Sequence, residues 1–230
     1  MRLIKEDEID SIYRDHIMIN NNHDYLTRYK DLPLDKNNKK WKWEGKDFPR
    51  IISLLEIERY INKYNINSKH ILSFNNISDP EMEYLKYDRI TNFNYEENKT
   101  DYDLHTLNIP QSDYDFSMFN QTLEHLYNPF VCLDNIYKYL SVGSYTYCNV
   151  PTVNIQHSLP NNFYTGFTPI GLAVLFKSCG FKIVEVGQWG TYEYISKIFK
   201  SHNWPDYQEL SGYVNEFKNP AQTWILAKKI

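Results

Sequence analysis

One stretch of the chain, residues 114–151, constrains the fold more than any other. It reads YDFSMFNQTLEHLYNPFVCLDNIYKYLSVGSYTYCNVP, in which an apolar run, a polar turn, a helical segment and a second apolar run follow one another. The first apolar run ends abruptly at Asn120 and Gln121, as a buried parallel strand does where its carboxyl end meets a ligand crevice. The stretch therefore predicts a strand, a helix and a second strand, with the polar turn facing a ligand.

Strands and helices alternate along the rest of the chain. Strands are expected at 70–75, 89–94, 114–120, 144–150, 181–187 and 222–228. Helical periodicity is expected over 49–64, and two further helices have start signals at Asn128-Pro129 and Thr168-Pro169. Gly143 and Gly180 are expected to end these two helices.

This alternation predicts an α/β fold, a Rossmann-like and mainly parallel seven-stranded sheet with helices on both faces. The last two strands have only a weak helical signal between them, which indicates an antiparallel edge strand. Residues 1–48 are polar and interrupted, and we expect them to form an N-terminal extension or lid. Residues 49–230 would form one domain, since 230 residues with 42% hydrophobic content suffice for one core of ordinary size.

Composition disfavours several classes of partner. A net charge of -4 argues against a broad phosphate-binding face, so nucleic acid is a minority hypothesis. No apolar run approaches the length of a membrane span, and acidic residues near the start argue against a signal peptide. The three cysteines form no C-x-x-C pair and lie in apolar patterns, so we expect reduced core thiols in a cytoplasmic protein.

Four strings in order along the chain resemble a known family. They are YDFSMFNQTLEHLYNP, YLSVGSYTYCNVP, HSLPNNFYTGFTPIGLAVLFKSCGFKIVEV and AQTWILAKK. Together they resemble the class I S-adenosylmethionine-dependent methyltransferases of the methyltransferase type 11 kind, over about residues 49–229. The resemblance implies S-adenosylmethionine as the cofactor and methyl transfer, most simply to an oxygen of a small metabolite or sugar.

The resemblance also implies where the cofactor binds. Family members carry a Gly-rich turn after the first strand, an acid after the second strand and an Asp beside the adenine ring. The corresponding positions, with the polar turn of the opening stretch, are Phe74, Asn75, Asn76, Asn94, Asp103, Leu104, Asn120 and Gln121. Asn replaces glycine in the turn and the acid after the second strand, which compromises close backbone approach and leaves Asp103 as the best cofactor residue.

Gln121, Glu124 and His125 stand at i, i+3 and i+4, so one helical turn would place them on one face. Some members of the family hold a divalent metal at this spacing, and His157 would be a further ligand. Mixed imidazole and carboxylate ligation would suit Mn, Fe, Co or Zn. The alternative is that Glu124 and His125 only organise the turn before the helix.

Methyl transfer requires alignment of the reacting atoms and a base that removes the proton of the acceptor. His125 and His157 are the candidates, because both follow strand ends and histidine titrates near neutral pH. Phe163 and Tyr164 are expected to line the acceptor pocket, or else to pack under the loop.

Two other functions remain open. The replaced glycines at Asn75 and Asn76 and the missing acid at Asn94 are compatible with a catalytically impaired relative that acts as a binding or scaffold protein. The Glu-His spacing is also suggestive of RNA 2′-O-methylation, which the net charge disfavours.

Overall fold

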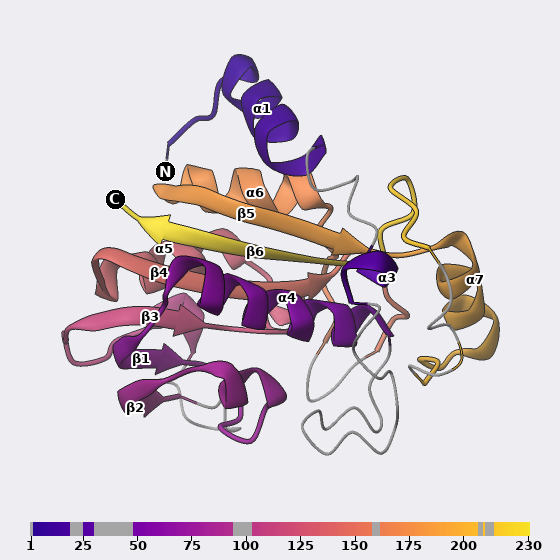
Figure 1. Cartoon of the computed structure of the whole chain (residues 1–230). Helices are drawn as coiled ribbons and strands as arrows, with labels where there is room; N and C mark the ends of the chain where they lie inside the picture. Colours follow the sequence, from indigo (N-terminus) through magenta and orange to yellow (C-terminus); the bar gives the residue numbers. More distant parts are fainter. Residues whose placement is uncertain are drawn as a thin grey trace.

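The computed structural model describes residues 2–18, 25–29, 48–93, 103–157, 162–206, 209 and 214–230. Within these residues the strands form one six-stranded sheet with the order β2-β1-β3-β4-β6-β5 (Figure 1). The strands are β1 (Ser68–Ser73), β2 (Tyr87–Asn92), β3 (Tyr114–Met118), β4 (Leu140–Pro151), β5 (Phe181–Trp189) and β6 (Gln222–Lys229).

The expected α/β class with a mainly parallel sheet is confirmed. Strands β2, β1, β3 and β4 pair in parallel, whereas β6 is antiparallel to both β4 and β5. Two details differ from the expectation. The described residues contain six strands instead of seven, and the antiparallel strand lies one place in from the edge, with β5 at the edge. Strand β5 ends on the same side of the sheet as the carboxyl ends of the parallel strands. The chain returns to the sheet from that side, so β6 must run in the opposite direction.

Helices cover both faces of the sheet, as expected. Helix α4 (Phe48–Tyr64) packs on one face, where its apolar side chains join Phe116, Tyr147 and Trp224 in one buried cluster. Helices α5 (Pro129–Tyr139) and α6 (Pro169–Ser178) lie on the opposite face, in a second cluster that includes Cys148 and Ile225. Since neighbouring strand residues point to opposite faces, Tyr147 and Cys148 contribute to different clusters.

The start signals of α5 and α6 act as the sequence predicts. The side chain of Asn128 accepts a hydrogen bond from the Val131 N–H, and Thr168 does the same for Gly171. The expected end of α5 was wrong, because the helix ends at Tyr139 and Gly143 lies within β4. Gly143 has a φ of +87°, and it lies where the pairing register of β3 and β4 shifts, so its freedom serves a bulge instead of a helix end.

The connections between the first three strands are not regular helices in the described residues. A 3-10 helix, η2 (Pro80–Tyr84), joins β1 to β2, and a second, η4 (Leu104–Thr106), precedes β3. The turn after β3 contains a third, η5 (Leu123–His125). Helix α7 (Tyr192–Ser201) lies between β5 and β6, where the sequence signal was weak.

The described parts of residues 1–48 pack against the sheet domain. Helix α1 (Glu6–Ile12) continues into the π-helix η1 (Tyr13–Met18) beside α6 and β5, and α3 (Tyr25–Arg28) lies near the start of α4 (Figure 1). Tyr25 is buried against Trp224. No helix among the described residues has the length and apolar character that crossing a bilayer requires.

Candidate functional site

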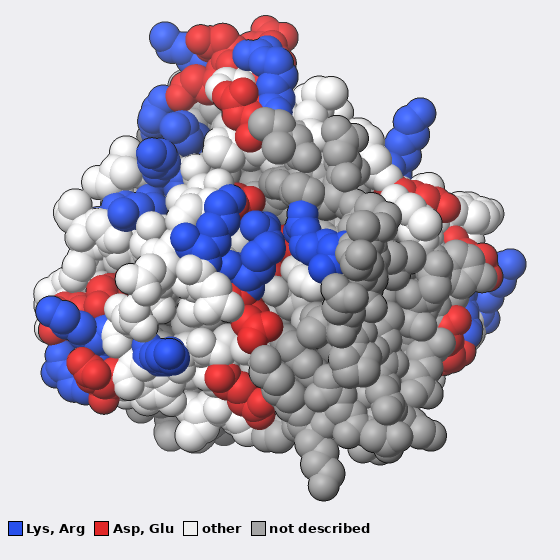
Figure 2. Space-filling view, in the orientation of Figure 1, with Lys and Arg blue, Asp and Glu red and all other residues white. Residues whose placement is uncertain are grey.

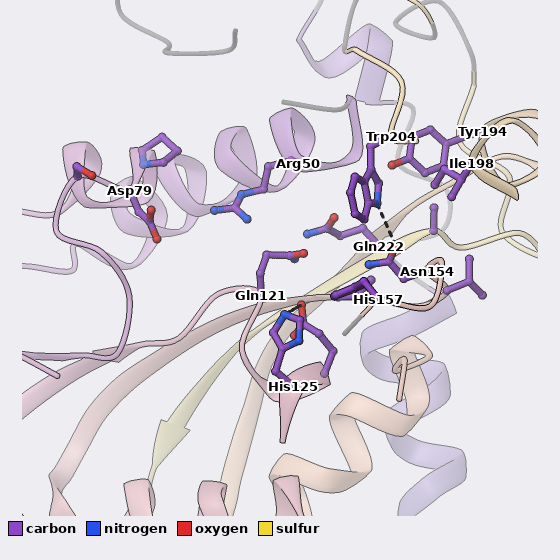
Figure 3. A pocket seen from close by; sticks show the side chains of 16 residues that line it. Arg50, Asp79, Gln121, His125, Asn154, His157, Tyr194, Ile198, Trp204 and Gln222 are labelled. Carbon is purple, nitrogen blue, oxygen red and sulfur yellow. Dashed lines mark hydrogen bonds and ion pairs between the residues drawn. The ribbon is translucent and has the colours of Figure 1, made fainter. Parts of the chain in front are cut away.

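A cavity of about 570 Å³ lies at the edge of the sheet where the parallel strands end (Figure 3). The loops after β1, β3 and β4 line it, together with α7, the segment after α7 and the start of β6. Because β6 is antiparallel, its first residues meet the carboxyl ends of the parallel strands. The cavity therefore occupies the position where open α/β sheets bind ligands.

Two histidines meet in the wall of this cavity. His125 lies in η5 and His157 follows β4, and their ring centroids are 5.3 Å apart. In each ring Nδ1 lies at hydrogen-bond distance from a main-chain carbonyl oxygen, that of Asn162 at 3.1 Å for His125 and that of Ile155 at 3.0 Å for His157. A carbonyl oxygen only accepts, so Nδ1 carries the proton and a neutral ring keeps its lone pair on Nε2.

Burial holds the pKa of His125 below its ordinary value, and the neighbouring His157 ring adds to this, while the hydrogen bond to Asn162 opposes it. A lowered pKa favours the neutral ring at pH 7. The Nε2 atom of His125 is therefore a proton acceptor.

Glu124 lies beside the histidines and is 1% exposed. Its Oε1 is 3.9 Å from His125 Nε2, and its Oε2 has no hydrogen-bond partner in the part of the chain that the structure describes. Burial raises the pKa of this carboxyl to about 8, against smaller opposing effects of its own backbone and of Arg50. Glu124 is therefore mainly a neutral carboxylic acid at pH 7.

The side of the cavity toward α4 carries opposite charges. Arg50 projects from α4 and Asp79 follows β1, and both lie on the same side in Figure 3. Arg50 forms an ion pair of 2.6 Å with Glu81, which is fully buried. Arg50 therefore joins the cavity wall to a buried carboxylate.

The predicted metal ligands do not form a metal site. No group of three His, Cys, Asp or Glu side chains among the described residues could hold an ion, and Glu124, His125 and His157 are all described. The i, i+3, i+4 argument assumed an α-helical turn, whereas Gln121 has a φ of +50° and precedes a single 3-10 turn. The Gln121 side chain donates to Asn149 Oδ1 at 2.8 Å. The structure thus gives no support to the predicted metal.

Most of the predicted cofactor positions lie outside the cavity. Asn75 and Asn120 form reciprocal hydrogen bonds of 2.7 Å, in which the Asn75 side-chain amide donates to the Asn120 carbonyl and accepts from its N–H. Both are buried. These bonds join the ends of β1 and β3 at the turn where the family carries glycines. Among the predicted cofactor positions that the structure describes, Gln121 alone lines the cavity.

The remaining predicted cofactor residues have local roles where the structure describes them. The Asp103 carboxylate accepts from the His105 N–H at 2.9 Å and contacts its Nδ1 at 2.7 Å, which caps η4. Asn76 Oδ1 accepts from the Ser78 N–H. Phe74 and Leu104 are buried, and Asn94 lies outside the described residues. Their cofactor roles stay predictions.

The predicted acceptor residues lie next to the cavity and do not line it. The Phe163 N–H donates to the His157 carbonyl, and its ring centroid is 5.6 Å from that of His157. The Tyr164 N–H donates to the Glu124 carbonyl, while its side chain is 53% exposed. They hold the histidine-bearing loops together.

The residues that line the cavity and that sequence reasoning missed include Arg50, Asn154, Trp204 and Gln222. They come from four separate segments, and each reads locally as an ordinary helix, loop or strand residue. The polar residues that follow β4 and precede β6 could have indicated these cavity residues from the sequence, because both positions fall where the parallel strands end and ligands bind.

Neither protein-family models nor curated proteins match the chain. Solved structures do. A candidate methyltransferase from Bacillus halodurans superimposes with a TM-score of 0.51 and 10% identity, over 76% of this chain and 98% of that one. The chain has the class I methyltransferase fold. The cyclase SpnF also superimposes, with a TM-score of 0.50 and 10% identity over 82% of this chain and 86% of that one. This fold therefore accommodates more than one chemistry.

Proposed function

We propose that this chain is an S-adenosylmethionine-dependent methyltransferase that acts on an oxygen of a small polar metabolite. The observation that carries the proposal is one cavity, at the ligand edge of a class I methyltransferase fold, with opposite charges on one side and two histidines nearby. In this arrangement the charged side would hold the cofactor and the histidine side would hold the acceptor.

The residues on the charged side fit the methionine end of the cofactor. Arg50 suits its carboxylate and Asp79 suits its ammonium group. When bound, the cofactor would supply an electrophilic methyl group on a sulfonium. The fit is limited to the methionine end of the cofactor. The Asn75 side chain is already hydrogen-bonded to Asn120, and the Asp103 carboxylate caps η4.

The histidine side supplies the base. The Nδ1–H of His125 is held by a carbonyl oxygen, so its Nε2 would accept the proton of an acceptor hydroxyl as the oxygen becomes nucleophilic. His157 has the same tautomer and lies beside it. Trp204 and Tyr194 border the cavity and would limit access of water to the acceptor.

Calorimetry with S-adenosylhomocysteine tests the proposal. We expect saturable binding that weakens by about tenfold or more in Arg50→Gln, because a charged hydrogen bond is lost. Asp88→Asn, an exposed change in β2, should leave the affinity unchanged. A chain that binds no S-adenosylhomocysteine at millimolar concentration would contradict the proposal.

A second candidate is a binding protein that retains the fold without the cofactor. The observation in its favour is the reciprocal bonding of Asn75 and Asn120, which occupies the turn after β1 where the family carries glycines. Asn75→Gly removes the bonds and returns a glycine to the turn. Tighter S-adenosylhomocysteine binding in this variant favours the enzyme, and absence of binding in both forms favours the binding protein.

A further inference from the structure

The histidine side of the cavity is rich in hydrogen-bond acceptors because of a buried amide. Asn149, near the end of β4, is fully buried, and its Oδ1 accepts from Gln121 Nε2 at 2.8 Å and from Gln222 Nε2 at 3.0 Å. Its Nδ2 donates to Glu81 Oε1 at 3.2 Å. Both glutamine NH₂ groups donate to Asn149, so the Oε1 oxygen of each glutamine is an acceptor left for a ligand, together with any N–H of the same amide that Asn149 does not take.

The histidines add acceptors of the same kind. Their Nδ1 atoms lie at hydrogen-bond distance from main-chain carbonyls, so Nε2 is the acceptor atom of each ring when the ring is neutral. Glu124 lines the same wall, and its Oε2 has no hydrogen-bond partner among the described residues. As a neutral carboxylic acid it can donate one hydrogen bond as well as accept. Hydroxyl groups both donate and accept, so they suit this wall better than a phosphate or carboxylate, which only accepts.

Trp204 gives the cavity one flat apolar wall. Its Nε1–H donates to Asn154 Oδ1 at 3.0 Å, so the polar group of the indole already has a partner and the ring offers a ligand apolar surface. The side chain lines the cavity, lies next to Asn154 in Figure 3 and is 44% exposed. A half-exposed aromatic face gains stability when a flat ring covers it.

We infer that the cavity accepts a polyhydroxylated ring, a sugar or cyclic polyol, whose hydroxyls donate to the Gln121, Gln222 and histidine acceptors while one ring face covers Trp204. Such a ring combines several donors with a face of C–H groups, which matches the two kinds of wall. This inference rests on the proposed function, because it identifies the class of methyl acceptor.

Ligand-observed saturation-transfer NMR tests it with four probes: methyl α-glucoside, myo-inositol, cyclohexanol and cyclohexanecarboxylate. The last two have rings of similar size without the set of hydroxyls. We expect transfer to the first two probes from the native protein. Trp204→Ala should weaken their binding about tenfold, whereas Tyr192→Ala, which removes an exposed aromatic of α7 outside the cavity, should not.

Gln222→Met supplies a second variant, which keeps the side-chain length and removes the acceptor oxygen. A circular dichroism spectrum identical to that of the native protein is required of each variant, and Trp204→Ala meets this condition most easily because Trp204 is half-exposed. The inference is overturned if neither hydroxylated probe binds, if cyclohexanol or cyclohexanecarboxylate binds equally well, or if Trp204→Ala binds the sugars unchanged.

The S-adenosylhomocysteine calorimetry separates this inference from the proposed function. Cofactor binding without sugar binding would refute the acceptor class and leave the methyltransferase proposal standing. Sugar binding without cofactor binding would refute the methyltransferase proposal and support a sugar-binding protein of this fold.

Discussion

Replacing Glu124 by glutamine should stabilise the protein by an amount that grows with pH. Glu124 is 1% exposed, and burial raises the pKa of its carboxyl to about 8 from an ordinary value of 4.5. Above pH 4.5 the unfolded chain releases this proton while the folded protein keeps it. Each pH unit in this interval therefore lowers the free energy of unfolding by about 1.4 kcal/mol.

From about pH 5 to about pH 8 the loss amounts to about 4 kcal/mol, and above pH 8 it stops growing because both states are ionised. Glutamine has nearly the same shape and does not titrate. The difference in free energy of unfolding between Glu124→Gln and the native protein should therefore rise by about 4 kcal/mol across this range.

Urea unfolding followed by circular dichroism at four pH values measures this difference. Asp88→Asn provides a matched exposed carboxyl, whose effect should be small at every pH. A difference that stays constant from pH 5 to pH 8 would refute the conclusion that Glu124 is neutral in the folded protein. A difference that decreases with pH would mean that the carboxylate is paired.

Three further predictions concern stability and reactivity. Gly190→Ala should lower the free energy of unfolding by about 3 kcal/mol or more, because a Cβ there would lie 2.1 Å from two backbone atoms. Gly143→Ala should lower it by only about 1 kcal/mol, because a Cβ there meets open space and only the positive φ is unfavourable. Thermal unfolding compares the two variants. Glu56→Gln should lower the free energy of unfolding by about 3 kcal/mol, since Arg28 and Arg59 lose their buried carboxylate partner. Urea unfolding should give a similar loss at low and at high salt, because the ion pairs are buried. The three cysteine thiols are free and buried, and burial raises the pKa of each. Iodoacetamide at pH 8 should therefore leave the native protein unmodified and label it only in denaturant. Fast labelling of the native protein would contradict the placement of the cysteines in the core.

Local patterns in the sequence were sufficient to locate the regular elements. The strands were expected within a few residues of their bounds, because each is an apolar run ended by polar or turn residues. The starts of α5 and α6 follow from side chains that cap within three residues of themselves. Such signals act over short distances along the chain and can therefore be read from it.

Properties that depend on distant partners could not be read in this way. The place of β6 between β4 and β5 depends on its pairing with β4, whose partner residues lie 71 (Pro151 with Gln222) to 83 (Tyr145 with Lys228) positions earlier, and no local signal encodes it. The spacing of Gln121, Glu124 and His125 suggested a shared face, but a positive φ at Gln121 removes the helical geometry that this required. Arg50 reaches the cavity from α4, which precedes residues 114–151 by many positions in the sequence. Only the tertiary structure brings the two segments together.

The position of β6 also determines when the sheet can form during synthesis. Every other strand precedes β6 in the chain, yet β6 alone connects β5 to the rest of the sheet. Until residues 222–229 have left the ribosome, β5 has no strand partner in the described sheet, the edge of β4 that β6 covers is unpaired, and the cavity lacks one wall. We expect a chain that stops before Gln222 to associate with other copies through this edge.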